Sequence, residues 1–79
     1  MRLEAALAGI AGAPVELERP AKAEHGDYAT NVALRTAPAQ GRPPREVAEA
    51  LVPRVVGLPD VERAEVAGPG FLNLWLTDA

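Results

Sequence analysis

The sequence predicts an α+β fold, a two-layer sandwich in which helices cover one face of a small antiparallel sheet. Three observations lead to this class. Apolar side chains recur at helical spacing in some stretches, alternate with polar ones in others, and a glycine–proline–glycine turn joins the last two alternating stretches. The expected order is helix, strand, helix, helix, strand, strand, within a single domain that spans residues 1–79.

A short helix and a strand are expected first. Between residues 2 and 10, leucine and isoleucine recur at spacings of four and three, which predicts an amphipathic helix that Gly9 and Gly12 end. Residues 15–19 alternate apolar and charged side chains. We therefore expect a strand there, which Pro20 stops.

Two further helices are expected in the middle of the chain. Asp27 is a favourable N-cap with Thr30 three residues later, so a helix is expected to begin there and to close at residues 38–41. The prolines at 43–44 suit the first turn of the next helix. Its apolar stripe consists of Val47, Ala48, Leu51, Val52 and Val55. Pro53 lies within this stripe and predicts a kink or an early end.

Residues 61–67 and 71–77 are expected to form the last two strands, an antiparallel hairpin. In the second of them the leucines at 72, 74 and 76 share one face, which supplies the side buried beneath the helices. Phe71, Asn73 and Trp75 share the opposite face. That face is left open to water or to a partner.

Composition excludes several classes of protein. The chain has no cysteine and one histidine, which removes a disulfide framework and a cysteine or histidine metal cluster. A net charge of −3 argues against a domain that is held to nucleic acid mainly through phosphate contacts. No membrane span or signal pattern is present in the sequence, so we expect a soluble, cytoplasmic protein. A monomer is expected as well.

The sequence offers little for catalysis. His25 and Asp27 resemble a base with its orienting carboxylate, but a capping aspartate beside a surface histidine explains them better. The chain contains no serine or cysteine to act as a nucleophile. We expect no covalent catalysis.

Other polar residues are open to two interpretations. The turn of Gly68, Pro69 and Gly70 can be a phosphate cradle, although the proline removes a donor, so a turn that aims the next strand is favoured. Arg42 and Arg45 either contact a phosphate or lie in a solvated loop. A solvated strand face is expected for Glu62, Arg63 and Glu65.

The face of Phe71, Asn73 and Trp75 has two readings of nearly equal weight. A neighbouring loop or the first helix can bury it. Alternatively it is a stacking platform, on which an aromatic ring takes a base and the adjacent amide meets the base edge. Such binding does not require a positively charged surface, so an acidic domain is compatible with it.

Three stretches together resemble a known family. HGDYATNVAL at 25–34, PREVAEAL at 44–51 and VERAEVAGPGFLNLWL at 61–76 are similar, in that order and spacing, to the N-terminal additional domain of arginyl-tRNA synthetases. The resemblance extends from about Val15 to the end of the chain. The combination of GDYATN with AGPGFLN is its most specific part.

The resemblance implies a module of a class I arginine–tRNA ligase that grips the tRNA corner containing the D-loop. Phe71 and Asn73 match the aromatic and amide that contact the D-loop in that family, and residues 68–70 match the turn that presents them. GDYATN matches as a structural motif. Trp75 carries no family role and is expected either to contact RNA or to pack on the catalytic domain.

The nucleotide-binding signatures of class I synthetases, HIGH-like and KMSK-like, are missing from these residues, as is an anticodon-binding helical domain. We therefore expect an excised domain or a stand-alone copy that is inactive alone. ATP and magnesium belong to the parent enzyme, and this domain is expected to hold no cofactor. The expected partners are the D-loop of tRNA(Arg) and the catalytic domain. The competing hypothesis is an interdomain or protein docking module that touches no RNA.

Overall fold

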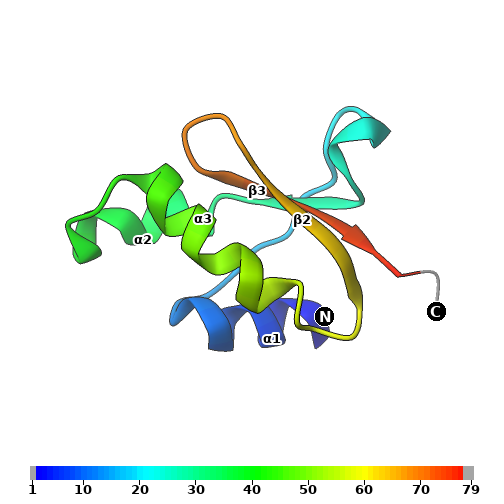
Figure 1. Ribbon diagram of the computed structural model, residues 1–79, viewed down its shortest axis with the longest axis horizontal. Coiled ribbons are helices and arrows are strands. Elements are labelled where there is room, and N and C mark those ends of the chain that lie inside the picture. Colours follow the sequence, from blue (N-terminus) through cyan, green and yellow to red (C-terminus); the bar gives the residue numbers. More distant parts are fainter. Residues whose placement is uncertain (1, 78–79) are drawn as a thin grey trace.

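The computed structural model describes residues 2–77 and has three helices on one side of a three-stranded antiparallel sheet (Figure 1). The elements are α1 (Arg2–Ala11), a 3-10 turn η1 (Ala23–His25), β1 (Tyr28–Thr30), α2 (Val32–Gln40), α3 (Pro44–Val55), β2 (Val61–Ala67) and β3 (Phe71–Leu76). The predicted fold class is therefore confirmed. Among the described residues, no helix has the length and apolar character that a membrane span needs.

Strand β3 lies at the centre of the sheet, whose order is β1-β3-β2. It pairs antiparallel with both neighbours, so that Asn73 lies opposite Ala29 on one side and Glu65 on the other. A register shift between Val61 and Arg63 places an extra residue, Glu62, in β2. This bulge brings Arg63 opposite Trp75 and therefore onto the same face of the sheet.

The leucines of β3 supply the buried face, as expected. Leu72 and Leu74 are 1% and 0% exposed, whereas Leu76 at the end of the strand is only partly buried. They pack against side chains from all three helices: Leu3, Leu7, Val32, Ala33, Ala37, Val47, Ala48, Leu51 and Val55. One small core thus holds the two layers together, and α1 packs against α3 on the covered side of the sheet.

The prediction of a helix that begins at Asp27 is wrong. Residues Tyr28–Thr30 form β1, and α2 begins only at Val32. The Asp27 carboxylate accepts a hydrogen bond from the backbone N–H of Leu76 at 2.8 Å, and its own N–H bonds the carbonyl of Leu74. Asp27 therefore ties this segment to β3. The side-chain oxygen of Thr30 accepts from the N–H of Val32 and so satisfies one free donor at the start of α2.

The strand predicted at residues 15–19 is reduced to a single antiparallel bridge. Glu18 and Ala29 exchange two backbone hydrogen bonds, of 2.9 and 2.8 Å, and the ladder extends no further. Val15 is nevertheless buried, as the alternating pattern predicted. The position of the first strand thus moves from residues 15–19 to β1, which lies between this bridge and β3.

Both helices of the middle region contain a proline near their end. Helix α2 passes Pro38 and closes at Gly41, whose φ of 64° is the left-handed conformation of a C-cap. Helix α3 begins at Pro44, as predicted, and continues past Pro53 to Val55. Pro53 therefore does not end the helix at its own position, and termination comes two residues later.

Candidate nucleic-acid interface

The open face of the sheet carries the residues that the alternation in β3 singled out. Cross-strand partners share a face, so Phe71 lies with Ala67, Asn73 with Ala29 and Glu65, and Trp75 with Arg63. No helix covers this side (Figure 1). The three side chains differ, however, in what surrounds them.

Phe71 is the exposed member. Its side chain is 42% exposed, the highest value among the large apolar residues that the structure describes. An exposed phenylalanine ring at the start of a central strand does not gain the free energy that burial of its apolar surface would contribute, because it stays in contact with water. It is therefore well placed to stack against a flat partner.

Asn73 lies in the middle of the face and is only 9% exposed. Its side-chain amide makes no hydrogen bond with any described residue. None of the fully buried side-chain nitrogens and oxygens in residues 2–77 lacks a partner, so this amide still reaches solvent. Its donors and acceptor are thus free for an incoming group.

Trp75 has two close neighbours within the domain. The Arg63 guanidinium lies 4.4 Å from the ring centroid. Gly26 is also close, since a Cβ at that position would lie 3.3 Å from a carbon atom of the ring. Arg63 also forms an ion pair with Glu65. Trp75 therefore differs from Phe71, because its ring already has a cationic neighbour within the domain.

The turn that precedes Phe71 is held by helix α3. Gly68 has a φ of 54°, and its carbonyl accepts a hydrogen bond of 2.8 Å from the Arg45 guanidinium. A Cβ on Gly70 would lie 2.7 Å from Cβ of Pro44. Pro69 stands between these two glycines at the exposed tip. The turn and the start of α3 are thus fitted to each other, and this fixes where β3 begins.

Sequence reasoning missed this role of Arg45. The pair Arg42 and Arg45 was considered as loop residues, but Arg45 belongs to α3 and Arg42 pairs with Glu46 at 3.3 Å. Nothing in the local pattern links position 45 to position 68. The glycines at 68 and 70 were the only signal: Gly68 has a positive φ, and Gly70 packs closely against Pro44 at the start of α3.

A small pocket of about 90 Å³ opens beside Phe71. Its floor and walls come from β1, from the ring of Phe71 and from the segment that contains the Glu18 bridge: Glu16, Glu18, Arg19, Pro20, Ala29, Thr30, Asn31 and Phe71. Arg19 also lies over the Tyr28 ring, at 5.1 Å from its centroid. The pocket adjoins the open face and is next to the residues predicted to bind RNA.

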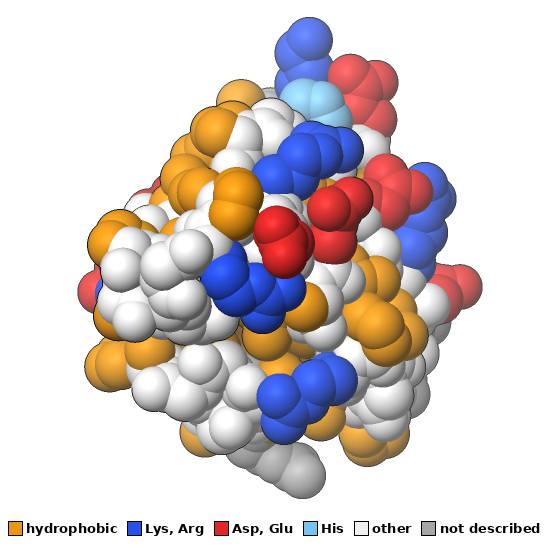
Figure 2. Space-filling model, turned by 60° about the vertical axis from the view of Figure 1, so that its left-hand side comes forward, with side chains coloured by type: hydrophobic (Ala, Val, Ile, Leu, Met, Phe, Trp, Pro, Cys, Tyr) orange, Lys and Arg blue, Asp and Glu red, His pale blue; other side chains and the backbone are white. Residues whose placement is uncertain are grey.

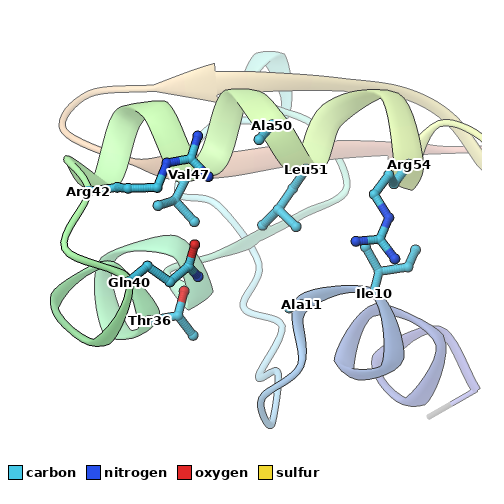
Figure 3. Close-up of a pocket in the computed structure, with 9 residues that line it drawn as sticks. All are labelled: Ile10, Ala11, Thr36, Gln40, Arg42, Val47, Ala50, Leu51 and Arg54. Carbon is cyan, nitrogen blue, oxygen red and sulfur yellow. The ribbon is translucent and has the colours of Figure 1, made fainter.

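A larger cavity, of about 250 Å³, lies elsewhere, between the end of α1 and the facing sides of α2 and α3 (Figure 3). Thr36 and Gln40 project into it from α2, and Arg54 reaches from α3 toward Ile10. The Thr36 hydroxyl already donates to the carbonyl of Val32. None of the residues predicted to contact RNA lines this cavity, so the open face remains the candidate interface despite its smaller pocket.

The remaining polar candidates do not assemble into a catalytic or metal site. His25 is exposed, and the Asp27 carboxylate is engaged by the Leu76 N–H. Over residues 2–77, no three His, Asp, Glu or Cys side chains come together as metal ligands would. Figure 2 shows acidic and basic side chains interspersed rather than gathered by sign. The face in view therefore has no large field of a single sign.

Comparison with known proteins decides the family. The sequence profile described as "Arginyl tRNA synthetase N terminal domain" matches residues 2–76. The chain belongs to this family. Arginine–tRNA ligases of Citrifermentans bemidjiense, Micrococcus luteus and Paracoccus denitrificans are 50%, 49% and 52% identical to it over 82%, 90% and 87% of the chain.

The fold agrees with that assignment. The solved arginyl-tRNA synthetase of Thermus thermophilus matches 96% of the chain with a TM-score of 0.77 and 28% sequence identity. The chain covers 13% of that structure and 12%, 13% and 12% of the three ligases named above. It thus corresponds to one small part of such a synthetase.

Proposed function

We propose that this domain recognises the D-loop of arginine tRNA on behalf of an arginine–tRNA ligase. Phe71 stacks on a D-loop base, and the free amide of Asn73 forms hydrogen bonds with a base edge. The observation that carries the proposal is the pairing of an exposed ring with an unpartnered amide two residues along the central strand. Family membership supports tRNA as the ligand.

The surroundings of the two residues fit this division of roles. Stacking is tolerant of base identity, whereas an amide with free donors and an acceptor discriminates between base edges. The Gly68–Gly70 turn fixes the start of β3 through Arg45 and Pro44 and so orients the ring. The ring of Trp75 is covered by Arg63, so we assign Trp75 a position beside this contact and not the stacking role of Phe71.

Catalysis is assigned to the rest of a parent enzyme. ATP and magnesium would bind there, together with arginine, and the catalytic domain would be the second partner of this module. A cytoplasmic location and a monomeric state stay predictions.

The competing function is a docking module whose open face binds a protein surface. The acidic net charge of −3 favours it, because RNA repels an acidic domain. The same exposed Phe71 would then insert into an apolar pocket of the partner. Against this stands the free amide of Asn73, since a protein interface gains little from a polar group at its centre unless that group is paired.

A titration separates the two functions. Transcribed arginine tRNA is added to the folded chain, and binding is followed by Trp75 fluorescence and by NMR shifts. The proposal predicts shifts that are concentrated at Phe71, Asn73 and the turn before them. The absence of tRNA binding would favour docking, and binding that shifts signals only away from the open face would contradict the proposed contact. A tRNA transcript that lacks the D-arm is the control ligand.

A further inference from the structure

The pocket beside Phe71 has an acidic wall that neither the fold nor the proposed contacts explain. Glu16 and Glu18 line it, and the two carboxylates make no ion pair or hydrogen bond within residues 2–77. Arg19 is adjacent in sequence to Glu18, yet its guanidinium lies over the Tyr28 ring. Two unpaired carboxylates therefore face a pocket whose other side is an exposed aromatic ring.

The geometry of this pocket follows from the sheet. Glu18 pairs with Ala29, and Ala29 pairs with Asn73, so the three residues form one row across the open face. Neighbouring strands are about 4.8 Å apart, so Glu18 and Asn73 are separated by about 10 Å between their backbones. Ala29 lies between them and lines the pocket floor, whereas Asn73 lies beside the pocket and is not one of its lining residues.

The pocket, of about 90 Å³, is smaller than a whole nucleotide and suits the ribose or one base edge of a nucleotide that stacks on Phe71. A nucleotide whose base rests on Phe71 extends far enough to bring its ribose or a second base edge toward the opposite wall. Ionised carboxylates only accept hydrogen bonds, so this wall selects N–H and O–H donors and repels phosphate. A glutamate that hydrogen-bonds a ribose hydroxyl is a common arrangement in nucleotide sites.

We propose that Glu18 accepts a hydrogen bond from a donor group, the ribose 2′-hydroxyl or a base N–H, of the nucleotide that stacks on Phe71. The inference rests on the proposed function and adds a specificity-determining residue to it. The Glu18 backbone is fixed by its two hydrogen bonds to Ala29, which holds this wall in place. Asn73, 9% exposed and unpartnered beside the same floor, provides a second polar contact for that nucleotide.

The sign of one mutational effect tests the proposal. Glu18→Gln removes a negative charge, which by repulsion alone should tighten the binding of any RNA. If Glu18 accepts a hydrogen bond, the same change replaces a charged acceptor by a weaker neutral one and weakens binding of transcribed arginine tRNA to the chain by about threefold to tenfold. Glu49→Gln is the matched control, because Glu49 is exposed on α3, outside this pocket, and carries the same charge. Binding that Glu18→Gln tightens or leaves unchanged overturns the proposal.

Two modified RNAs identify the donor. Each is prepared at the D-loop nucleotide whose base identity changes the effect of Asn73→Ala. If a 2′-deoxy substitution removes the difference in affinity between Glu18→Gln and wild type, the donor is the ribose hydroxyl. If the difference in affinity instead disappears when the base is replaced by one that lacks the N–H, the donor is the base. A difference that survives both substitutions overturns the proposal.

The affinity of Phe71→Ala, measured in parallel, distinguishes failure of the role of Glu18 from failure of the proposed function on which it rests. A loss of affinity with Phe71→Ala but none with Glu18→Gln leaves D-loop recognition standing and overturns only the role of Glu18. No loss with Phe71→Ala overturns both. Circular dichroism of every variant establishes that the fold is retained.

Discussion

Arg63 covers Trp75: its guanidinium lies 4.4 Å from the centre of the indole ring and is held there by Glu65. The pairing arises because the bulge at Glu62 turns Arg63 onto the open face. It divides this face into a packed part at Trp75 and an exposed part at Phe71. The two aromatic residues of one strand face are therefore not equivalent.

Removal of the guanidinium should expose the indole. We expect Arg63→Ala to increase quenching of Trp75 fluorescence by acrylamide and to lower the free energy of unfolding by about 0.5–1 kcal/mol, the usual contribution of an exposed cation–π contact. Arg42→Ala, which removes an arginine on the helical side, should leave the quenching unchanged. Equal quenching in all three proteins would contradict the contact.

A second prediction concerns the buried face of β3. Leu74→Ala should lower the free energy of unfolding by about 2–5 kcal/mol, because the side chain is fully enclosed and its loss leaves a cavity. Leu76→Ala should cost clearly less, since Leu76 is only partly buried. Denaturant titrations of the two variants measure both values. A reversed order would mean that the register of β3 is displaced.

Gly26 is expected to tolerate no side chain. Its φ is 100°, and a Cβ there would lie 2.6 Å from the carbonyl oxygen of Leu74. Gly26→Ala should therefore destabilise the domain more than Gly12→Ala, because Gly12 also has a positive φ, of 73°, but open space around it. Thermal melting compares the two. Equal losses would show that backbone strain alone, and not the contact with β3, governs Gly26.

The chain alone should neither exchange pyrophosphate with ATP nor aminoacylate tRNA. The sequence contains neither of the nucleotide-binding signatures of class I synthetases. The measurement is isotope exchange with purified chain, and a full-length arginine–tRNA ligase serves as the positive control. Exchange that persists through repurification would contradict the assignment of catalysis to a separate part.

Alternation in β3 correctly predicted which face of the strand is buried, because a central strand with one leucine face leaves no choice of register. It also placed Phe71 and Asn73 on the face opposite the leucines, which agrees with the register of the sheet. The prediction failed in GDYATN, where an aspartate before a helix was interpreted as its cap. The Asp27 carboxylate instead bonds the backbone of Leu76, a partner 49 residues away that no local pattern reveals.

Two other features of the site were beyond sequence reasoning for the same reason. Arg45 reaches the Gly68 carbonyl across 23 residues, and Glu18 faces Phe71 only because β1 lies between them in the sheet. Both depend on tertiary arrangement. The burial of Asn73 was also not expected, since the alternation assigned it to an open face without showing how closely its neighbours enclose it.

The central claim is that Phe71 and Asn73 read a D-loop nucleotide, and a mutant cycle tests it most directly. Affinities of wild type, Phe71→Tyr, Phe71→Ala and Asn73→Ala are measured against arginine tRNAs that differ only at that D-loop position. Phe71→Ala should lose about 1–3 kcal/mol with every base, Phe71→Tyr almost nothing, and Asn73→Ala should weaken only the preferred base. Equal affinity of all four proteins for every tRNA would contradict the claim and leave the docking module in its place.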